Sequence, residues 1–375
     1  MTKPNIVIVG GGYGGVEAAM KLENALHKTH QILLIERKTH FYHAIGGLRT
    51  IVEDGFENKI LIPYDSMFKF GGKILHATVI NIHEKEIIVD TETEFGTQIP
   101  FEYLIIATGS NYSYPGKTVS NKKDETVAHI VAQRNAVKNA ENILIIGGGP
   151  VGIELAGEIA STYKNKQVIL VSSGSNLLAE NSSPKLKQRL VKHLTDLNVR
   201  LIFGEKIDIS NIGDGLSPLN LETNKGTQIE SDVQFVAIGA KPNTEIAKTL
   251  NESIVEEGTN LIKVKPTLQL NHDEYQHIFA IGDVTNIQET KLGFRAGLQA
   301  NVAANNIIAL INKKKLTEYK PLSEVMFVTV GKTKGSGLLP IFGGMVVGSY
   351  MIKTLKGKDF GFPKYWKTLN ATLKN

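Results

Sequence analysis

The chain has 375 residues, 42% of them hydrophobic, which is long enough for two or three domains with ordinary buried cores. It contains no cysteine, so disulfides, cysteine-ligated zinc or iron–sulfur sites and thiol relays through its own side chains are excluded. We expect no metal site. The formal net charge is +5, and no apolar run is long enough for a membrane-spanning helix.

The first feature along the chain is a short apolar segment, residues 6–9, followed by Gly10, Gly12 and Gly15 and then a helical pattern. This G-x-G-x-x-G spacing is typical of a dinucleotide site. The first glycine permits a tight turn, the second lets the backbone approach the pyrophosphate, and the third lets helix and strand pack closely. The start of the helix presents free N–H groups to the phosphates. Glu36 ends the next strand, 21 residues after Gly15, where it would accept hydrogen bonds from the adenosine ribose.

The same arrangement recurs at Gly147, Gly149 and Gly152, so the sequence predicts two dinucleotide sites. The second strand of this repeat ends at Ser172-Ser173. It therefore offers neither an acid for a ribose nor a nearby arginine for a 2′-phosphate. NADH and NADPH both remain candidates for this site.

Two acids, Glu154 and Glu158, follow the second glycine turn and lie four residues apart on one face of the expected helix. One interpretation is a pair of acids stabilised by the positive end of the helix dipole. The other is that Glu154 lies at the reactive ring of the bound nucleotide. The sequence leaves both open.

Three further apolar strands end in glycine. The first leads into Thr108-Gly109, and the last leads into Gly282-Asp283 before a helical pattern over residues 292–311. We interpret these strands as points where the chain crosses between domains. Continuous apolar strands that alternate with helices are typical of parallel sheets covered on both faces. The predicted fold is therefore α/β, with two Rossmann-like dinucleotide-binding domains and a small C-terminal module.

Because the chain is expected to cross between domains at these strands, we predict a discontinuous first domain, residues 1–116 and 244–312. The second domain is residues 117–243. Residues 313–375 form the C-terminal module and carry 12 lysines against 3 acids. This surplus is either an ordinary solvated surface or a source of attraction to an anionic membrane. The apolar stretch 337–352 is either a strand pair packed on the first domain or a segment that enters a membrane surface.

Together, the two glycine units, Ala-Thr-Gly at 107–109 and Gly-Asp at 282–283 resemble the flavoproteins with two dinucleotide-binding domains. Within that superfamily, segments 41–43, 53–56 and 358–360 resemble the family of ferroptosis suppressor proteins and mitochondrion-associated apoptosis-inducing-factor homologues. The resemblance implies FAD in the first domain, NADH or NADPH in the second, and a ubiquinone- or menaquinone-type acceptor. It thus implies an FAD-dependent NAD(P)H:quinone oxidoreductase whose C-terminal module forms the quinone approach and touches a membrane.

The predicted site combines these motifs with positions that the resemblance carries over. Glu154 is expected where nicotinamide meets flavin, and Asp283 at a ribityl hydroxyl. His43 and Lys291 are the candidate proton donors to the quinone. The resemblance alone suggests Arg49 and Lys117 as flavin contacts. The expected cofactor-binding residues are Gly10, Gly12, Gly15, Glu36, Arg49, Thr108, Gly109, Lys117, Asp283, Gly147, Gly149 and Gly152.

The sequence departs from the family at two positions. Thr2 replaces the glycine of the N-myristoylation signal of animal relatives, so no acyl anchor is expected. Gln299 stands where relatives often carry histidine, so no proton-relay role is carried over to it. The start of the chain leaves no room for a signal or transit peptide. We expect an intracellular protein, cytoplasmic or peripheral on a lipid droplet, the mitochondrial outer membrane or the plasma membrane.

Other functions of this scaffold are excluded on chemistry or stay open. Thioredoxin, disulfide and sulfide:quinone reductases work through cysteines, which this chain lacks. A ferredoxin-type reductase needs only the flavin and a docking surface, and a redox-sensing flavoprotein effector needs little turnover, so both stay open. The basic module would bind nucleic acid only without sequence preference. A homodimer is also open.

Overall fold

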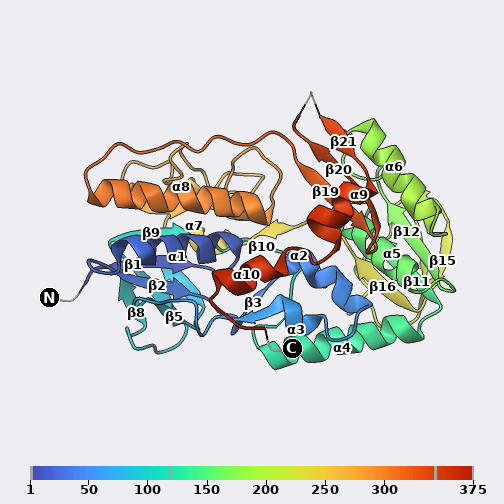
Figure 1. Ribbon diagram of the computed structural model, residues 1–375, viewed down its shortest axis with the longest axis horizontal. Coiled ribbons are helices and arrows are strands. Elements are labelled where there is room, and N and C mark those ends of the chain that lie inside the picture. The colour runs from blue at the N-terminus through green and yellow to red at the C-terminus, as the bar shows by residue number, and fades with distance from the viewer. Residues whose placement is uncertain (1–2, 119, 342–343, 374–375) are drawn as a thin grey trace.

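The computed structural model describes residues 3–118, 120–341 and 344–373. Thr2, on which the expectation about myristoylation rests, lies outside these residues, as do residues 342–343 of the apolar stretch. Figure 1 shows two units side by side, each built on a parallel sheet, with the C-terminal segment in red lying across both.

The first unit is a five-stranded parallel sheet whose two faces are covered differently. Its strands, in spatial order, are β18 (Ile278–Ala280), β9 (Tyr103–Ile106), β1 (Asn5–Val9), β2 (Gln31–Ile35) and β5 (Lys73–Leu75). Ile6 and Ile8 face the helices α1 (Tyr13–Leu26) and α8 (Gly293–Ile311). Val7 and Val9 face the other way, onto the antiparallel sheet β6 (Val79–Ile82), β7 (Glu86–Val89) and β8 (Gln98–Pro100). Successive side chains of a strand point to opposite faces, which is why an uninterrupted apolar run was needed here.

The second unit repeats this plan with four parallel strands. They are β13 (Arg200–Phe203), β12 (Gln167–Ser172), β11 (Asn142–Ile146) and β16 (Val233–Val236). Ile143 and Ile145 pack with α4 (Lys123–Asn139), α5 (Pro150–Thr162) and α6 (Pro184–Thr195). Leu144 and Ile146 pack with the hairpin β14 (Leu219–Glu222) and β15 (Gln228–Ser231).

Short elements join the two units. The antiparallel pair β10 (Ser110–Asn111) and β17 (Lys241–Pro242) lies where the chain leaves the first unit and returns to it. The other short elements, mostly in the first unit, are β3 (His40–Tyr42), β4 (Leu61–Pro63), α2 (Ala44–Gly47), α3 (Glu57–Ile60), α7 (Glu245–Lys248) and the 3₁₀ helices η1 (Leu48–Ile51), η2 (Glu252–Ile254) and η3 (Gly282–Val284).

The C-terminal segment contains an antiparallel sheet of β19 (Met326–Val330), β20 (Lys334–Leu339) and β21 (Met345–Val347). The apolar stretch 337–352 therefore supplies parts of two paired strands, as one interpretation of the sequence predicted. That interpretation was wrong about where they pack. The sheet lies against α5 and α6 of the second unit, because the buried side chains of Val328, Val330 and Leu338 join the core of that unit.

The rest of the segment returns to the first unit. After α9 (Ser349–Ile352) and the π-helical turn η4 (Lys353–Gly357), helix α10 (Phe362–Thr368) packs its Trp366 into the core around α1. The indole of Trp366 donates a hydrogen bond to the carbonyl of Lys59 at 2.8 Å. The C-terminal segment thus binds both units (Figure 1). Within the described residues, no helix combines the length and the apolar character needed to cross a membrane.

Arg49 connects all three parts of the structure. Its Nε and Nη2 donate to the carboxylate of Glu158 on α5 at 3.2 and 2.8 Å, and its Nη1 donates to the carbonyl of Gly357 at 2.9 Å. The guanidinium lies 4.2 Å from the ring centre of Phe360. Both charged side chains are almost fully buried, at 2% and 1% exposure. Burial raises the pKa of Glu158, and the Arg49 charge and hydrogen bonds oppose that rise.

We predict that Arg49→Met lowers the free energy of unfolding by about 3–5 kcal/mol, because it leaves Glu158 buried without its counter-charge. Urea denaturation of the apoprotein measures the change. Arg49→Met/Glu158→Met removes both charges and should recover most of the loss. Lys192→Met, which breaks the exposed pair with Asp196, is the matched control and should change stability little. If Arg49→Met left apoprotein stability unchanged and affected only flavin retention, this connecting role would be refuted.

Candidate active site

The first glycine turn has the geometry of a phosphate cradle. Gly10 adopts φ +104°, and a Cβ on it would overlap the carbonyl oxygen of Ala107 at the end of β9. A Cβ on Gly15 would overlap the carbonyl oxygen of Gly10, so α1 could not approach β1 as closely. Gly12, in contrast, has no atom within 4 Å of its Cβ position. The backbone at Gly12 therefore faces open space at the start of α1, as a bound pyrophosphate requires.

Glu36 closes the cradle at the end of β2. Its Oε2 accepts a hydrogen bond from the Gly11 N–H at 2.5 Å, and its Oε1 accepts from the backbone and side chain of Lys38 at 2.8 and 2.7 Å. Burial works against ionisation of Glu36, but the charge of Lys38 and these hydrogen bonds outweigh it and lower the pKa. Glu36 is thus held as an anion, the form that accepts hydrogen bonds from ribose hydroxyls.

The two crossing strands are joined by reciprocal hydrogen bonds. Thr108 Oγ1 donates to the carbonyl of Asn243 at 2.7 Å, and Asn243 Nδ2 donates to the carbonyl of Thr108 at 2.9 Å. The Asn243 N–H also donates to the carbonyl of Gly109 at 2.9 Å. The predicted residues Thr108 and Gly109 therefore lie at the connection between the units, next to the Ala107 carbonyl that packs on Gly10.

Asp283 and two lysines form a polar group beside this connection. Ser110 Oγ donates to Asp283 Oδ2 at 2.6 Å. Burial lowers the pKa of Lys117, against the effect of the nearby Asp283. Lys291 donates to the carbonyls of Thr285 and Ile287 at 2.7 and 2.9 Å, and burial lowers its pKa as well.

Gln299 belongs to a buried network that fixes the turn before Asp283. Its Oε1 accepts from the Gly282 N–H at 2.7 Å, and its Nε2 donates to Glu289 at 2.8 Å. Glu289 also accepts from Arg295 at 3.2 Å and from the hydroxyl of Tyr319 at 2.9 Å. The side chain of Gln299, which does not itself titrate, thus orients the Gly282 backbone.

The second glycine turn reproduces the first. Gly147 adopts φ +130°, and a Cβ on it would overlap the carbonyl of Ala237 at the end of β16. A Cβ on Gly152 would overlap the carbonyl of Gly147, and Gly149 is open like Gly12. The buried Ser172 takes the place that Glu36 occupies in the first unit, and its hydroxyl donates to the carbonyl of Asn176 at 3.3 Å.

Glu154 meets the C-terminal segment. Its Oε1 accepts from the backbone N–H of Thr329 at 2.8 Å, from the Thr329 hydroxyl at 3.1 Å and from Lys356 Nζ at 2.5 Å. Lys356 also donates to the carbonyl of Phe327 at 3.2 Å. The pair is nearly buried, with side-chain exposures of 8% for Glu154 and 19% for Lys356.

Two predicted residues face the C-terminal segment rather than a glycine turn. Arg49 is engaged by Glu158 and Gly357, as described above. His43 is fully buried, with its Nε2 3.0 Å from the carbonyl of Phe360 and its Nδ1 3.2 Å from the hydroxyl of Tyr13. The predicted residues thus form four groups: the two cradles, the crossing with Asp283, and the contacts with residues 356–360.

Sequence reasoning missed Lys356, Thr329, Glu289 and Tyr13. Lys356 is one of 12 lysines in the C-terminal module, and nothing in its spacing separates it from the others. Its partner Glu154 lies 202 residues away. Tyr13 stands inside the glycine motif, and a bulky aromatic residue there was the available signal.

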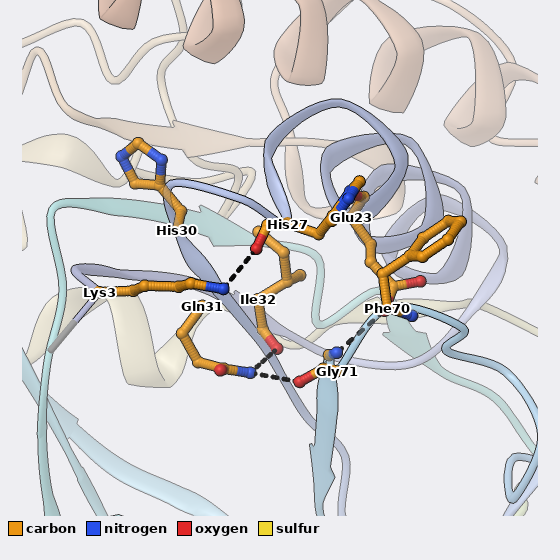
Figure 2. Close-up of a pocket in the computed structure, with 9 residues that line it drawn as sticks. Lys3, Glu23, His27, His30, Gln31, Ile32, Phe70 and Gly71 are labelled. Carbon is orange, nitrogen blue, oxygen red and sulfur yellow. Dashed lines mark hydrogen bonds between the residues drawn. The ribbon is translucent and has the colours of Figure 1, made fainter.

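A small surface cavity lies at the end of α1 away from the cradle (Figure 2). It has a volume of about 90 Å³, and Lys3, His27 and Phe70 are among its lining residues. Glu23, also in its wall, already accepts hydrogen bonds from the backbone of Lys69, Phe70 and Gly72. Ligand pockets usually measure about 300–1,000 Å³, so this cavity is too small for a dinucleotide.

The sequence profile of the family described as "Pyridine nucleotide-disulphide oxidoreductase" matches residues 4–305. The chain belongs to this family. Its relatives include "Ferroptosis suppressor protein 1" of Mus musculus, 33% identical with 98% of this chain and 96% of the relative covered. "Apoptosis-inducing factor homolog B" of Dictyostelium discoideum is 32% identical, with 98% and 97% covered. The solved sulfide:quinone oxidoreductase of Aquifex aeolicus has a TM-score of 0.78 at 16% identity, with 99% of this chain and 92% of that chain covered.

Membership of the family confirms the predicted resemblance and the α/β fold with two Rossmann-like units. It also confirms the prediction of an oxidoreductase that uses FAD and NADH or NADPH. The residues of both cradles fit these cofactors. Each turn leaves open backbone at its middle glycine, and the first has an ionised acid at the end of its second strand.

The two open glycines give a matched pair of variants. We predict that Gly12→Ala weakens FAD retention about 10- to 100-fold, because the methyl group enters the space of the pyrophosphate at a cost of about 1–3 kcal/mol. Gly149→Ala should leave the flavin bound and raise the KM for the nicotinamide nucleotide by a similar factor. Flavin fluorescence during dialysis and steady-state kinetics measure the two effects. Equal flavin loss in both variants would contradict the assignment of separate sites.

Proposed function

We propose that the chain is an FAD-dependent NAD(P)H:quinone oxidoreductase, with FAD in residues 1–116 and 244–312 and NAD(P)H in residues 117–243. The observation that carries the proposal is the convergence of the two cradles on one connection. Ala107 and Ala237, whose carbonyls pack on the first glycine of each cradle, directly precede the segments that meet through Thr108 and Asn243. Two nucleotides bound there would extend toward the same junction.

The bound FAD supplies the redox chemistry, since it accepts a hydride and returns electrons to an acceptor. The chain holds and orients the cofactors. The amides at the start of α1 and α5 would bind the pyrophosphates, Glu36 the adenosine ribose, and Asp283 with Lys117 the inner part of the flavin nucleotide. The guanidinium of Arg49, which the resemblance suggested as a flavin contact, is bonded instead to Glu158 and Gly357.

The Glu154–Lys356 pair would contact the nicotinamide end of NAD(P)H at the connection between the two units. The Nζ of the Lys356 ammonium group lies 2.5 Å from a carboxylate oxygen of Glu154, and the side chain is partly exposed to solvent. At short range, the buried carboxylate of Glu154 would stabilise a positively charged nicotinamide ring relative to a neutral one. Lys291 is the second proton-bearing group, next to Asp283 and Glu289.

The absence of cysteine excludes one route to the electron acceptor. The family is named after pyridine nucleotides and disulphides, but this sequence has no cysteine and so cannot pass electrons through a disulfide of its own. A quinone takes electrons directly from a flavin and needs only protons from the protein or water. The Aquifex aeolicus structure with the same fold is named as a sulfide:quinone oxidoreductase, which supports the quinone half of that reaction here.

We predict that NADH bleaches the flavin of the purified protein under anaerobic conditions and that a soluble quinone restores its colour. Glu154→Gln should slow the first step about 10- to 100-fold, because a neutral amide loses the charge that stabilises the developing nicotinamide cation. Stopped-flow absorbance measures both steps. Glu257→Gln, an exposed glutamate, is the control. A protein that purifies without flavin refutes the proposal, and reoxidation by ferredoxin alone would favour a ferredoxin-type reductase.

The C-terminal module supports peripheral contact with an anionic membrane. Tyr350, Met351 and Leu355 on α9 and η4 are 88%, 37% and 55% exposed. The exposed lysines Lys353 and Lys358 lie on the same short segment. Apolar side chains flanked by lysines suit the interface of an anionic bilayer, where each basic residue adds about 1 kcal/mol. This arrangement would give the protein access to a quinone dissolved in lipid.

We predict that the protein co-sediments with vesicles containing phosphatidylserine and that Tyr350→Ser/Leu355→Ser reduces the bound fraction several-fold. The cause is the loss of exposed apolar area, at about 25 cal/mol per Å². Neutral phosphatidylcholine vesicles and the variant Phe294→Ser, which removes an exposed aromatic residue on α8, are the controls. Equal binding of wild type and the double variant would exclude this surface as the contact.

A further inference from the structure

His43 makes hydrogen bonds on both sides of its ring, and their directions are fixed. The carbonyl of Phe360 can only accept, so Nε2, 3.0 Å away, carries the hydrogen. Nδ1 lies 3.2 Å from the hydroxyl of Tyr13. That hydroxyl also accepts from the Ile45 N–H at 3.3 Å, and its own hydrogen is therefore free to point at Nδ1. The arrangement that satisfies every group is a neutral imidazole with its hydrogen on Nε2.

The surroundings of His43 also favour this neutral form. The side chain is fully buried, and its ring packs against the rings of Tyr13 and Tyr365. Burial lowers the pKa of His43 to about 4, against the effects of the Phe360 carbonyl and of Asp359, while Lys356 lowers it further. The two tyrosines stay protonated, since burial raises the pKa of Tyr365 to about 12 and that of Tyr13 beyond the usual range.

The partner of His43 belongs to the segment that carries Lys356. Phe360 lies four positions after Lys356, and the N–H of Phe360 donates to the Lys356 carbonyl at 2.9 Å. Between them, Gly357 accepts a hydrogen bond from Arg49. Phe360 has a left-handed backbone, φ +54°, which a phenylalanine adopts only when its surroundings hold it there. From the first unit, His43 and Arg49 make hydrogen bonds to carbonyls of this turn, and Phe56 packs edge-on against the Phe360 ring.

We infer that His43 is a positioning residue that ties residues 356–360 to the first unit, so that Lys356 meets Glu154, and that it does not supply protons to the acceptor. The statement about proton supply rests on the proposed function of the Glu154–Lys356 pair. The statement that His43 holds residues 356–360 on the first unit does not depend on that function. Tyr13, which stands between the cradle glycines Gly12 and Gly15, links His43 to the start of α1, where the pyrophosphate would bind.

Two substitutions at His43 separate the roles. In His43→Gln, the amide can donate to the Phe360 carbonyl and accept from Tyr13, but it cannot titrate. His43→Leu has a similar volume and makes neither bond. Tyr13→Phe removes only the hydroxyl and serves if His43→Leu does not fold. The measurements are anaerobic flavin reduction by NADH and reoxidation by a soluble quinone between pH 5.5 and 9, together with limited proteolysis of residues 344–373 in the holoprotein.

For a positioning role, His43→Gln should keep both rates within about threefold of wild type, with the same pH profile and an intact C-terminal segment, because its hydrogen bonds are rebuilt. His43→Leu, or Tyr13→Phe to a smaller extent, should expose the segment to protease and slow flavin reduction. A proton donor would behave differently. Its loss costs about 10²- to 10⁴-fold in reoxidation, so such a loss in His43→Gln with the segment still protected would overturn the inference.

The pH dependence of the free energy of unfolding is a second test of how His43 is held. A histidine that is neutral in the folded protein takes up a proton on unfolding once the pH is below its unfolded pKa of about 6.5. The free energy of unfolding therefore decreases as the pH falls from that value towards the folded pKa. The wild type should therefore lose more stability between pH 7 and 5 than His43→Gln does. His40, whose pKa burial also lowers to about 4, contributes equally in both proteins. Identical pH dependence, or unchanged proteolysis in His43→Leu, would show that no tie exists. If wild type fails to reduce any quinone, the proposed function falls, and proteolysis still decides the tie.

Discussion

The close approach of a helix start to a strand end is the constraint on which the rest of the structure depends. At both turns the third glycine lies directly against the carbonyl of the first, and that first glycine lies against a carbonyl from the neighbouring strand. No residue with a Cβ can occupy these positions without moving α1 or α5 off its sheet. The same steric requirement leaves backbone N–H groups at the helix start uncovered, which makes the turn a binding site for phosphate. Fold and ligand site therefore have one cause.

This shared cause explains how much the sequence could predict. Glycine spacing and uninterrupted apolar strands are local signals, and both reflect packing that occurs within about 30 residues, as between Ile6 and Ile32 or Ile143 and Val168. The central strands of both sheets, the helices α1, α5 and α8 and the cradle glycines followed from these signals. The small antiparallel sheets β6–β8 and β14–β15 gave weaker signals because each strand is short and covered on one face only.

The polar contacts at the junction were beyond prediction because they join residues far apart in the chain. Arg49 meets Glu158 across 109 residues, and His43 meets Phe360 across 317. Neither pair has a spacing that a pattern could reveal. The error about the apolar stretch 337–352 has the same origin. A strand pair was one of two interpretations of this apolar stretch, but the sequence contains no information on which of two similar helical layers, α1 with α8 or α5 with α6, would receive the strands.

The C-terminal segment changes what the two-unit scaffold can do. It adds a further connection between the two units, beyond the crossing strands and the Arg49–Glu158 pair. Here the β19–β21 sheet is packed on the second unit and α10 on the first, so residues 348–361 are held at both ends. Lys356, Gly357 and Phe360 lie in that span and contact Glu154, Arg49 and His43 in turn. A change in the angle between the units must therefore move Lys356 relative to Glu154. The ion pair between Lys356 and Glu154 thus depends on how both units hold the C-terminal segment.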